Sequence, residues 1–165
     1  MDFESERTHK LGCWDADAAL TISVHALSTT EDTPDFKFED SFCDFLIDTG
    51  FGKDISHEER VFWRSAIQKN WGGNDGRKRA RMAAINLRDR DGLHARLLDV
   101  RCPVLWAHGT ADAVYSAANA EEEIKLFVNS PDARLQVVQD GQHYLNHSSP
   151  DEVNSLLLEF IAKHE

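Results

Sequence analysis

Two short apolar segments in the last third of the chain constrain the fold more than any other feature of the sequence. Residues 104–107 and 134–138 are rich in Val and Leu, and each is followed at once by a turn that contains glycine. Runs of this length that end in turn residues are typical of buried strands. Helix-forming stretches follow both segments, at about 117–129 and from Pro150 onward. This order of strand, helix, strand and helix predicts an α/β fold with parallel strands and a right-handed crossover.

The turns that end these two strands carry side chains capable of acid–base chemistry. Asp112 lies in the first turn and His143 lies in the second. In an open α/β sheet, catalytic groups gather where strands end, so these side chains can meet as the orienting carboxylate and the general base of a nucleophilic triad. Taken alone, the two residues also allow a simpler interpretation, in which Asp112 caps the next helix and His143 is an ordinary loop residue.

The helix that closes the chain has clear start signals. Ser149 is the expected N-cap, Pro150 takes the first helical position, and Glu152 completes a predicted capping box. Apolar residues then recur at helical spacing, which predicts a face that packs on the sheet. That face consists of Val153, Leu156, Leu157, Phe160 and Ile161.

The first hundred residues show a different pattern, in which helical segments are separated by Gly, Pro and Asn. Ser56 and Glu59 form a capping box, which predicts the start of the clearest helix in this region. A further helix is expected at 77–90. The apolar stretch 41–48 is expected to end at Gly50, because glycine commonly follows the last helical residue.

The segment before these helices is harder to interpret. Residues 16–19 contain alanines that favour a helix, whereas residues 20–24 alternate between apolar and polar side chains as a strand would. Both structures therefore stay open for this segment. Asp15 and Asp40 are placed to cap the segments that follow them.

The chain is strongly acidic, with 18 basic and 29 acidic residues and a net charge of -11. Such a surface repels phosphate backbones and anionic lipids, so neither a nucleic acid nor a membrane is an expected partner. Residues 77–81 form a basic run. We interpret this run as a solvated helix face whose charges pair with neighbouring acids, rather than as a nucleic-acid patch.

Further sequence features indicate a cytoplasmic protein. Residues 1–6 are acidic where a signal peptide needs basic and apolar regions, and no apolar stretch approaches the length of about 18 residues that a membrane span requires. Cys13, Cys43 and Cys102 are an odd number without a Cys-x-x-Cys pair, so no disulfide framework or zinc ribbon is implied. Each is expected to be a reduced and buried thiol.

Residues 102–112, which read Cys-Pro-Val-Leu-Trp-Ala-His-Gly-Thr-Ala-Asp, together with Gly141-Gln142-His143 and the closing helix, resemble the C-terminal third of an α/β-hydrolase. In that family the first block is the seventh strand with the triad acid, and the second follows the eighth strand and contains the triad histidine. The resemblance covers about 95–162. It implies that Asp112 is the acid and His143 the base of a serine-type triad.

The same resemblance implies an organisation and an activity. Residues 1–95 correspond to a helical cap, and residues 96–165 correspond to the β-α-β-α part of the hydrolase domain. The family activity is hydrolysis of esters, lactones or thioesters, so a small and fairly apolar carbonyl compound is the expected substrate. The blocks 11–15 and 42–46 resemble fungal members of the family, some of which belong to secondary-metabolite pathways.

The sequence also departs from the family pattern. It contains no Gly-x-Ser-x-Gly nucleophile elbow and no upstream His-Gly loop for oxyanion donors. Family members need roughly 250 residues or more. We therefore expect a truncated α/β-hydrolase that is inactive alone. With only two strands, the first has an unpaired apolar edge, which predicts a homo-oligomer or a complementing chain. The alternative is a non-catalytic binding or interaction module that docks with a partner chain.

Other nucleophiles have little support in the sequence. A thiolate beside His143 would be activated by it. Cys102, however, lies at the end of its strand opposite to the catalytic turns, and Cys13 and Cys43 lie in the cap region, where a buried thiol is the expected state.

A metal or a cofactor is not expected. His143 and His147, joined by His108 or Asp112, would need a helix to share one face, and Gly141 together with the Ser-Ser-Pro that follows leaves little room for one. Neither Gly-x-Gly-x-x-Gly nor a P-loop occurs, so nucleotide binding has no support.

The cap region contains aromatic residues that can line an apolar pocket. Of these, Trp63 and Trp71 are the expected substrate-binding residues, and ordinary core packing is the alternative for them.

Overall fold

The structure is a computed structural model, and it describes residues 10–13, 16–89 and 94–165. The chain divides into two compact units. The first, which we call the sheet unit, comprises residues 1–14, 49–52 and 92–165, and the second, the helical unit, comprises 15–48 and 53–91. Asp15 lies outside the described residues, and so does its predicted role as a cap.

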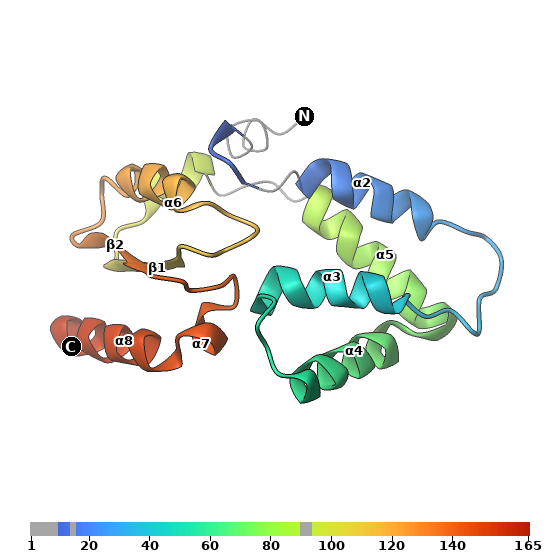
Figure 1. The fold of residues 1–165 in the computed structure, drawn as a ribbon. Coiled ribbons are helices and arrows are strands. Elements are labelled where there is room, and N and C mark those ends of the chain that lie inside the picture. Colours follow the sequence, from blue (N-terminus) through green and yellow to red (C-terminus); the bar gives the residue numbers. More distant parts are fainter. Residues whose placement is uncertain (1–9, 14–15, 90–93) are drawn as a thin grey trace. The chain divides into compact units, whose positions relative to one another are not determined.

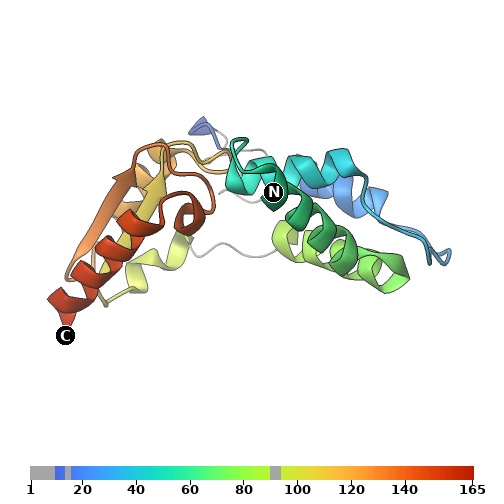
Figure 2. The ribbon, with the colours of Figure 1, turned by 60° about the horizontal axis from the view of Figure 1, so that its bottom comes forward.

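The sheet unit contains two parallel strands, β1 (Val104–Gly109) and β2 (Ala133–Val138), in register from Val104 opposite Ala133 to Gly109 opposite Val138. The crossover between them contains α6 (Ala117–Glu123) and the 3-10 turn η2 (Ile124–Leu126), and another 3-10 turn, η1 (His94–Asp99), precedes β1. After β2 come α7 (Leu145–Ser148) and α8 (Pro150–His164). Figures 1 and 2 show α6 on one face of the strands and α8 along the other. The predicted α/β fold with a parallel β-α-β-α part is therefore confirmed.

The core of this unit lies where α6 meets the strands. Val138 and Ala120 are fully buried, and the Trp106 ring on β1 meets the Phe127 ring edge-on at 6.4 Å between centroids. Both strands are short, and their Val and Trp residues, namely Val104, Trp106, Val137 and Val138, fit a pleated surface covered by helices. The helical part of the crossover is shorter than expected, because α6 ends at Glu123 and gives way to η2.

The start of α8 differs in one respect from the prediction. Pro150 is the first helical residue, as expected, but the Ser149 side chain makes no capping hydrogen bond, so the predicted box with Glu152 is wrong. Ser149 also ends α7, and its N–H donates to the carbonyl of Leu145. With φ -141° and ψ 55°, its backbone is set by the preceding turn rather than by the geometry that an N-cap needs.

The helical unit consists of α2 (Ala16–Ala26), α3 (Asp40–Phe51, whose last residues 49–51 group with the sheet unit), α4 (His57–Trp71) and α5 (Gly73–Asp89). The ambiguous segment is therefore a helix. The predicted capping box at Ser56 is present, with the Glu59 N–H donating to Ser56 Oγ at 3.2 Å and the Ser56 N–H donating to Glu59 Oε2 at 3.0 Å.

Three further boundaries in the chain depart from the prediction. The helix α5 begins at Gly73, four residues before the predicted start, because Gly73 adopts a φ of +67° that lets the chain turn directly out of α4. Likewise α3 continues through Gly50 and stops at Gly52, whose φ of +85° suits the residue after a helix. Asp40 is the first residue of α3, and its carboxylate accepts a hydrogen bond from Gln68 at 2.8 Å.

Packing within the helical unit combines small residues with ion pairs. Val24 of α2, Leu27 just after it, and Ala80 and Ala84 of α5 are buried, in agreement with the close course of these two helices in Figure 1. Between α3 and α4, Arg64 binds both carboxylate oxygens of Asp44, at 2.7 and 2.8 Å. No helix in the described part of the chain is long and apolar enough to span a membrane.

The three cysteines are free, but only two of them match the expectation of buried thiols. Cys13 and Cys43 are buried, whereas Cys102 is exposed. Cys102 precedes Pro103 and lies outside β1, which begins at Val104, so it is not part of the strand that the helices cover.

Candidate active site

The loop that leaves β1 holds an acid in a defined position. The Oδ1 atom of Asp112 accepts hydrogen bonds from the N–H groups of Val114 at 2.7 Å and Tyr115 at 3.0 Å, and the side chain is 7% exposed. The cap of α6 is a different residue, Ser116, whose Oγ accepts from the Asn119 N–H. Asp112 therefore closes a turn before the helix and does not cap the helix itself.

The loop that leaves β2 brings a histidine to this acid. His143 Nδ1 lies 3.1 Å from Oδ1 and 3.0 Å from Oδ2 of Asp112. An ionised carboxylate can only accept, so Nδ1 carries the hydrogen and donates it. In neutral His143 the lone pair is then on Nε2, which has no partner among the residues that the structure describes.

Two glycines allow the two loops to approach this closely. A Cβ atom on Gly109 would overlap the carbonyl of Gly141, and one on Gly141 would lie 3.0 Å from the Gly109 Cα. The Ala111 N–H donates to the Gly141 carbonyl at 2.9 Å across the same contact. Gly109 is therefore needed for its lack of a side chain, since any larger residue would push the acid loop and the histidine loop apart, whereas a Cβ on Gly141 would mainly overlap the Leu145 side chain.

Two further hydrogen bonds hold the loops after β1 and β2 in place. His108 is buried on β1, and its Nε2 lies 3.1 Å from the carbonyl oxygen of Tyr115 in the acid loop. Asp140 adopts a φ of +58°, a left-handed conformation that Asp tolerates, and its N–H donates to Thr110 Oγ1 at 2.8 Å. His108 thus acts as a brace, a role that sequence reasoning missed because a buried histidine in a strand gives no local signal.

Residues 49–52 also support the histidine loop within the sheet unit. The Tyr144 N–H donates to the Gly50 carbonyl at 2.8 Å. The Phe51 ring packs edge-on against the rings of Tyr144 and His147, with centroids 4.8 and 4.9 Å apart. This support also escaped the sequence analysis, since nothing local links residues so far apart in the chain.

The electrostatics of the pair favour its charged form. Burial alone would raise the pKa of Asp112, but the hydrogen bonds from His143, Tyr115 and Val114 outweigh it and lower that pKa below its ordinary value. The hydrogen bond to Asp112 raises the pKa of His143 above its ordinary value, against the opposing effect of burial. An imidazole held in this way is a stronger base than a free one, and the carboxylate stabilises it once it has taken a proton.

The other predicted site residues lie outside this loop pair. Trp63 and Trp71 belong to α4 in the helical unit, where the Trp63 ring meets the Phe62 ring edge-on at 5.1 Å. Their predicted contact with a substrate remains a prediction. The Cys13 Sγ accepts from the Ser116 N–H at 3.5 Å, and burial, with help from Asp40, raises the pKa of Cys43. A raised pKa makes the Cys43 thiol a poor nucleophile.

The alternative of a metal site gains no geometric support. His147 lies in α7 and His143 lies before it, so the two do not share a helix face. Among the described residues, no group of three His, Cys, Asp or Glu side chains is arranged to hold a metal ion.

Comparison with known proteins places this geometry in a wider context. Neither a protein-family model nor a curated protein matches the sequence. Among solved structures, the esterase from Thermogutta terrifontis superposes with a TM-score of 0.65 at 17% identity, over 92% of this chain and 52% of that one. The esterase from Exiguobacterium antarcticum gives 0.64 at 18% identity, over 88% and 48% of the two chains. A bromoperoxidase from Bacillus anthracis gives 0.62 at 18% identity, over 88% and 49%.

These matches concern the fold, and they are partial. The chain spans about half the length of the solved structures that it matches. They include proteins described as esterases and as a bromoperoxidase, so the fold alone does not select one activity. The chain has the fold of part of an α/β-hydrolase.

Proposed function

We propose that this chain is the acid–base part of an α/β-hydrolase, in which Asp112 orients His143 and His143 activates a nucleophile from outside these 165 residues. The observation that carries the proposal is the hydrogen bond of 3.0 Å between Asp112 and His143 at the ends of two parallel strands. The free Nε2 atom of His143 also supports the proposal, because it has no partner among the described residues and can accept a proton.

The proposed reaction is the hydrolysis of a small, fairly apolar ester, lactone or thioester. His143 Nε2 takes the proton of the attacking hydroxyl or thiol as the new bond to the carbonyl carbon forms. The same proton then passes to the leaving oxygen or sulfur, which departs. Water, deprotonated by His143 in the same way, then attacks the acylated nucleophile and releases the carboxylic acid product. Because His143 must be neutral to act, the rate should rise with pH as the pH passes its raised pKa. Trp63 and Trp71 are proposed to contact the apolar part of the substrate.

The nucleophile is proposed to come from a preceding segment of the same protein or from a separate chain that docks beside β1. Two findings support this. The matched solved structures are about twice as long as this chain, and β1 has a strand partner on only one side among the described residues. A strand edge without a partner is a surface on which another strand can pair.

The test compares the 165-residue chain with a longer product of the same gene that contains Gly-x-Ser-x-Gly upstream of Met1. The short chain is expected neither to hydrolyse a p-nitrophenyl ester nor to react with a fluorophosphonate, whereas the longer product should do both. His143→Ala should abolish both reactions, and Asp112→Asn should lower kcat by up to about 10⁴-fold. Asp140→Asn removes a charge from the same loop without touching His143 and should leave kcat unchanged.

Fluorophosphonate labelling of the short chain at a serine or cysteine would contradict an external nucleophile. Hydrolysis by the longer product that survives His143→Ala would contradict the role of the base.

A non-catalytic interaction module is the second candidate, and one observation favours it. Leu157, Leu158 and Ile161 of α8 are 47%, 68% and 52% exposed, although the first and last of them were predicted to face the sheet. An exposed apolar row on a helix suits a partner surface. If no product of the gene reacts with the fluorophosphonate, this candidate replaces the hydrolase.

A further inference from the structure

The basic run 77–81 behaves differently from its prediction. The sequence predicts that these charges pair with neighbouring acids on a solvated face. In the structure Arg77 is 4% exposed, and its guanidinium donates to the carbonyl of Leu27 at 2.5 Å and to Thr33 Oγ1 at 2.8 Å. Its further partner is Asn74 Oδ1 at 3.4 Å. All three partners are neutral, so no carboxylate among the described residues bonds to the guanidinium of Arg77.

Lys78 and Arg81 lack acidic partners as well. Neither side chain forms an ion pair or a hydrogen bond within the part of the chain that the structure describes. The Nε atom of Arg81 is buried without an acceptor. A buried donor without a partner is energetically unfavourable, so an arrangement of this kind favours a ligand that supplies the acceptor.

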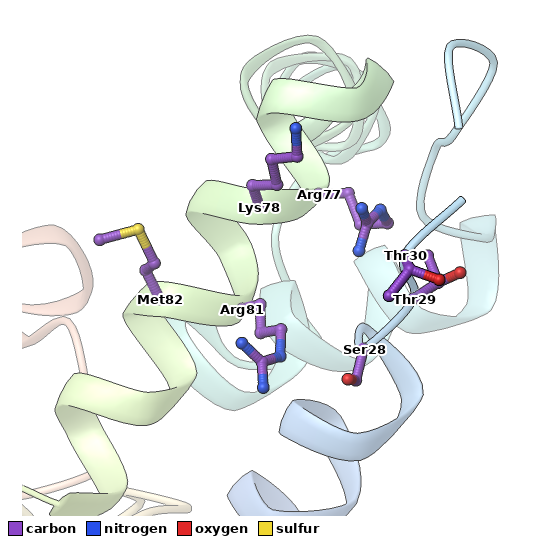
Figure 3. A pocket seen from close by; sticks show the side chains of 7 residues that line it. All are labelled: Ser28, Thr29, Thr30, Arg77, Lys78, Arg81 and Met82. Atoms are coloured by element: carbon purple, nitrogen blue, oxygen red, sulfur yellow. The ribbon is translucent and has the colours of Figure 1, made fainter. Parts of the chain in front are cut away.

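These cations line a pocket of the helical unit. It has a volume of about 730 Å³, and its opposite wall consists of Ser28, Thr29 and Thr30, which follow α2. Figure 3 shows Arg77 and Arg81 reaching from α5 toward this segment. The pocket therefore combines three positive charges with three hydroxyl groups, and none of the described residues that line it is acidic.

The nearest carboxylate in the hydrogen-bond network does not neutralise the cluster. Asp32 accepts from the Nδ2 of Asn74 at 2.9 Å and so reaches Arg77 only through that amide. In a chain with a net charge of -11, three cations in one pocket without an acidic partner among the described residues are unusual, because acidic groups are abundant elsewhere on it.

We propose that this pocket binds a phosphate group, with Lys78 and Arg81 as its direct cationic contacts and the hydroxyls of residues 28–30 as further donors. Arg77 adds its charge while its own hydrogen bonds hold the segment after α2 in place. A doubly charged group with three acceptor oxygens fits this number of donors better than a carboxylate does, and arginine binds phosphate oxygens through its planar fork. The site lies in the helical unit and is independent of the proposed hydrolase chemistry.

The test follows the arginine Nε–H resonances of the full chain by NMR during titration with inorganic phosphate. The Arg81 Nε–H signal should shift saturably, and acetate at matched ionic strength should bind at least about tenfold more weakly. Arg81→Gln and Lys78→Gln should each weaken binding by about tenfold, measured on backbone amides of residues 28–30. Arg79→Gln is the matched control: it removes the same charge from the same helix, but Arg79 lies outside the pocket and donates to the carbonyl of Asn70.

Two further binding experiments identify the molecule that carries the phosphate group. Glycerol 3-phosphate that binds at least as well as inorganic phosphate would support a soluble phosphomonoester. Cosedimentation with vesicles that contain phosphatidic acid, lost in Arg81→Gln, would instead support a lipid headgroup at the same site.

Either of two results would overturn the proposal. One is a linear shift that is equal for phosphate and acetate. The other is that Arg79→Gln and Arg81→Gln weaken phosphate binding equally. That result would indicate a general attraction of anions, including a single-stranded oligonucleotide, to the whole basic face of α5. Lys78 is exposed, so Lys78→Gln keeps the test valid even if Arg81→Gln fails to fold.

Discussion

The protonation of His143 depends on a single neighbour. Asp112 is the acceptor for Nδ1, and it is in turn held by two backbone N–H groups of its own loop. The raised pKa of His143 and the lowered pKa of Asp112 have this one hydrogen bond in common among their causes. Removing the carboxylate charge while keeping the shape of the side chain should therefore change the titration of the histidine more than it changes the fold.

Asp112→Asn is expected to lower the pKa of His143, because the charge that stabilises imidazolium is lost. The His143 Cε1–H resonance followed by NMR over pH 5 to 9 measures this shift, with Asp140→Asn as the control that should leave the pKa unchanged. The folded pKa of His143 exceeds its unfolded value of about 6.5. Its contribution to stability is therefore complete below about pH 6.5 and is lost as pH rises through the folded pKa.

A His143 titration that is identical in wild type and Asp112→Asn would show that the two side chains do not interact in solution.

At the scale of single elements, α4 and α8 are each preceded by a serine, but the two serines differ in backbone conformation. Ser56 accepts from the Glu59 N–H and completes a capping box, whereas Ser149 makes no capping hydrogen bond. The difference is in the backbone, because ψ is 156° at Ser56 and 55° at Ser149. An N-cap needs the extended conformation to aim its oxygen at the first turn.

Ser56→Ala should lower the free energy of unfolding by about 1 kcal/mol, because the N-terminal N–H groups of α4 lose their acceptor. Ser149→Ala is the matched control and should change it by less than about 0.5 kcal/mol. Urea denaturation followed by circular dichroism measures both. Equal losses would mean that Ser149 also caps its helix in solution.

The elements also show how far sequence patterns reach. The two strands and the start of α4 follow from local signals, namely apolar runs ended by turns and a capping box. The true end of α3 at Phe51, just before Gly52, is not evident from the sequence, because Gly50 and Gly52 look alike there and only the φ of +85° at Gly52 separates them. The meeting of Asp112 and His143 was predictable from their place after parallel strands. The contact between Gly109 and Gly141 that permits it was not, because it depends on atoms that belong to different loops.

At the scale of the whole molecule, the outer side of β1 is one of two strand edges of the sheet that have no partner among the described residues. The N–H groups of Val104 and Thr110 donate to carbonyls of Asp132 and Val138 on the β2 side, at 2.8 and 2.9 Å. Because alternate residues of a strand point to the same edge, the N–H groups of Leu105 and Ala107 point to the other edge. Within the described residues, the sheet has no strand there.

In the chain alone, the backbone amides of Leu105 and Ala107 should exchange hydrogen at least about tenfold faster than those of Trp106 and His108. Hydrogen exchange followed by NMR measures this alternation, and the even-numbered residues are the internal control. Protection of Leu105 and Ala107 that grows with protein concentration would identify a second copy as the partner of this edge. Equal protection at high dilution would show that the edge is covered within the chain.

The division of the chain has a consequence for how it folds. The sheet unit is assembled from three separate stretches, and the helical unit supplies the two connections between them, residues 15–48 and 53–91. An unfolded connection must lose closure entropy before its ends can meet, whereas a folded one brings them together in advance. The contacts inside each helix are near in sequence and form fast, whereas the packing of α2 on α5 joins the two connections across a long stretch of chain. A mutation that slows the packing of α2 on α5 should therefore also delay the contact of Phe51 with the rings of Tyr144 and His147.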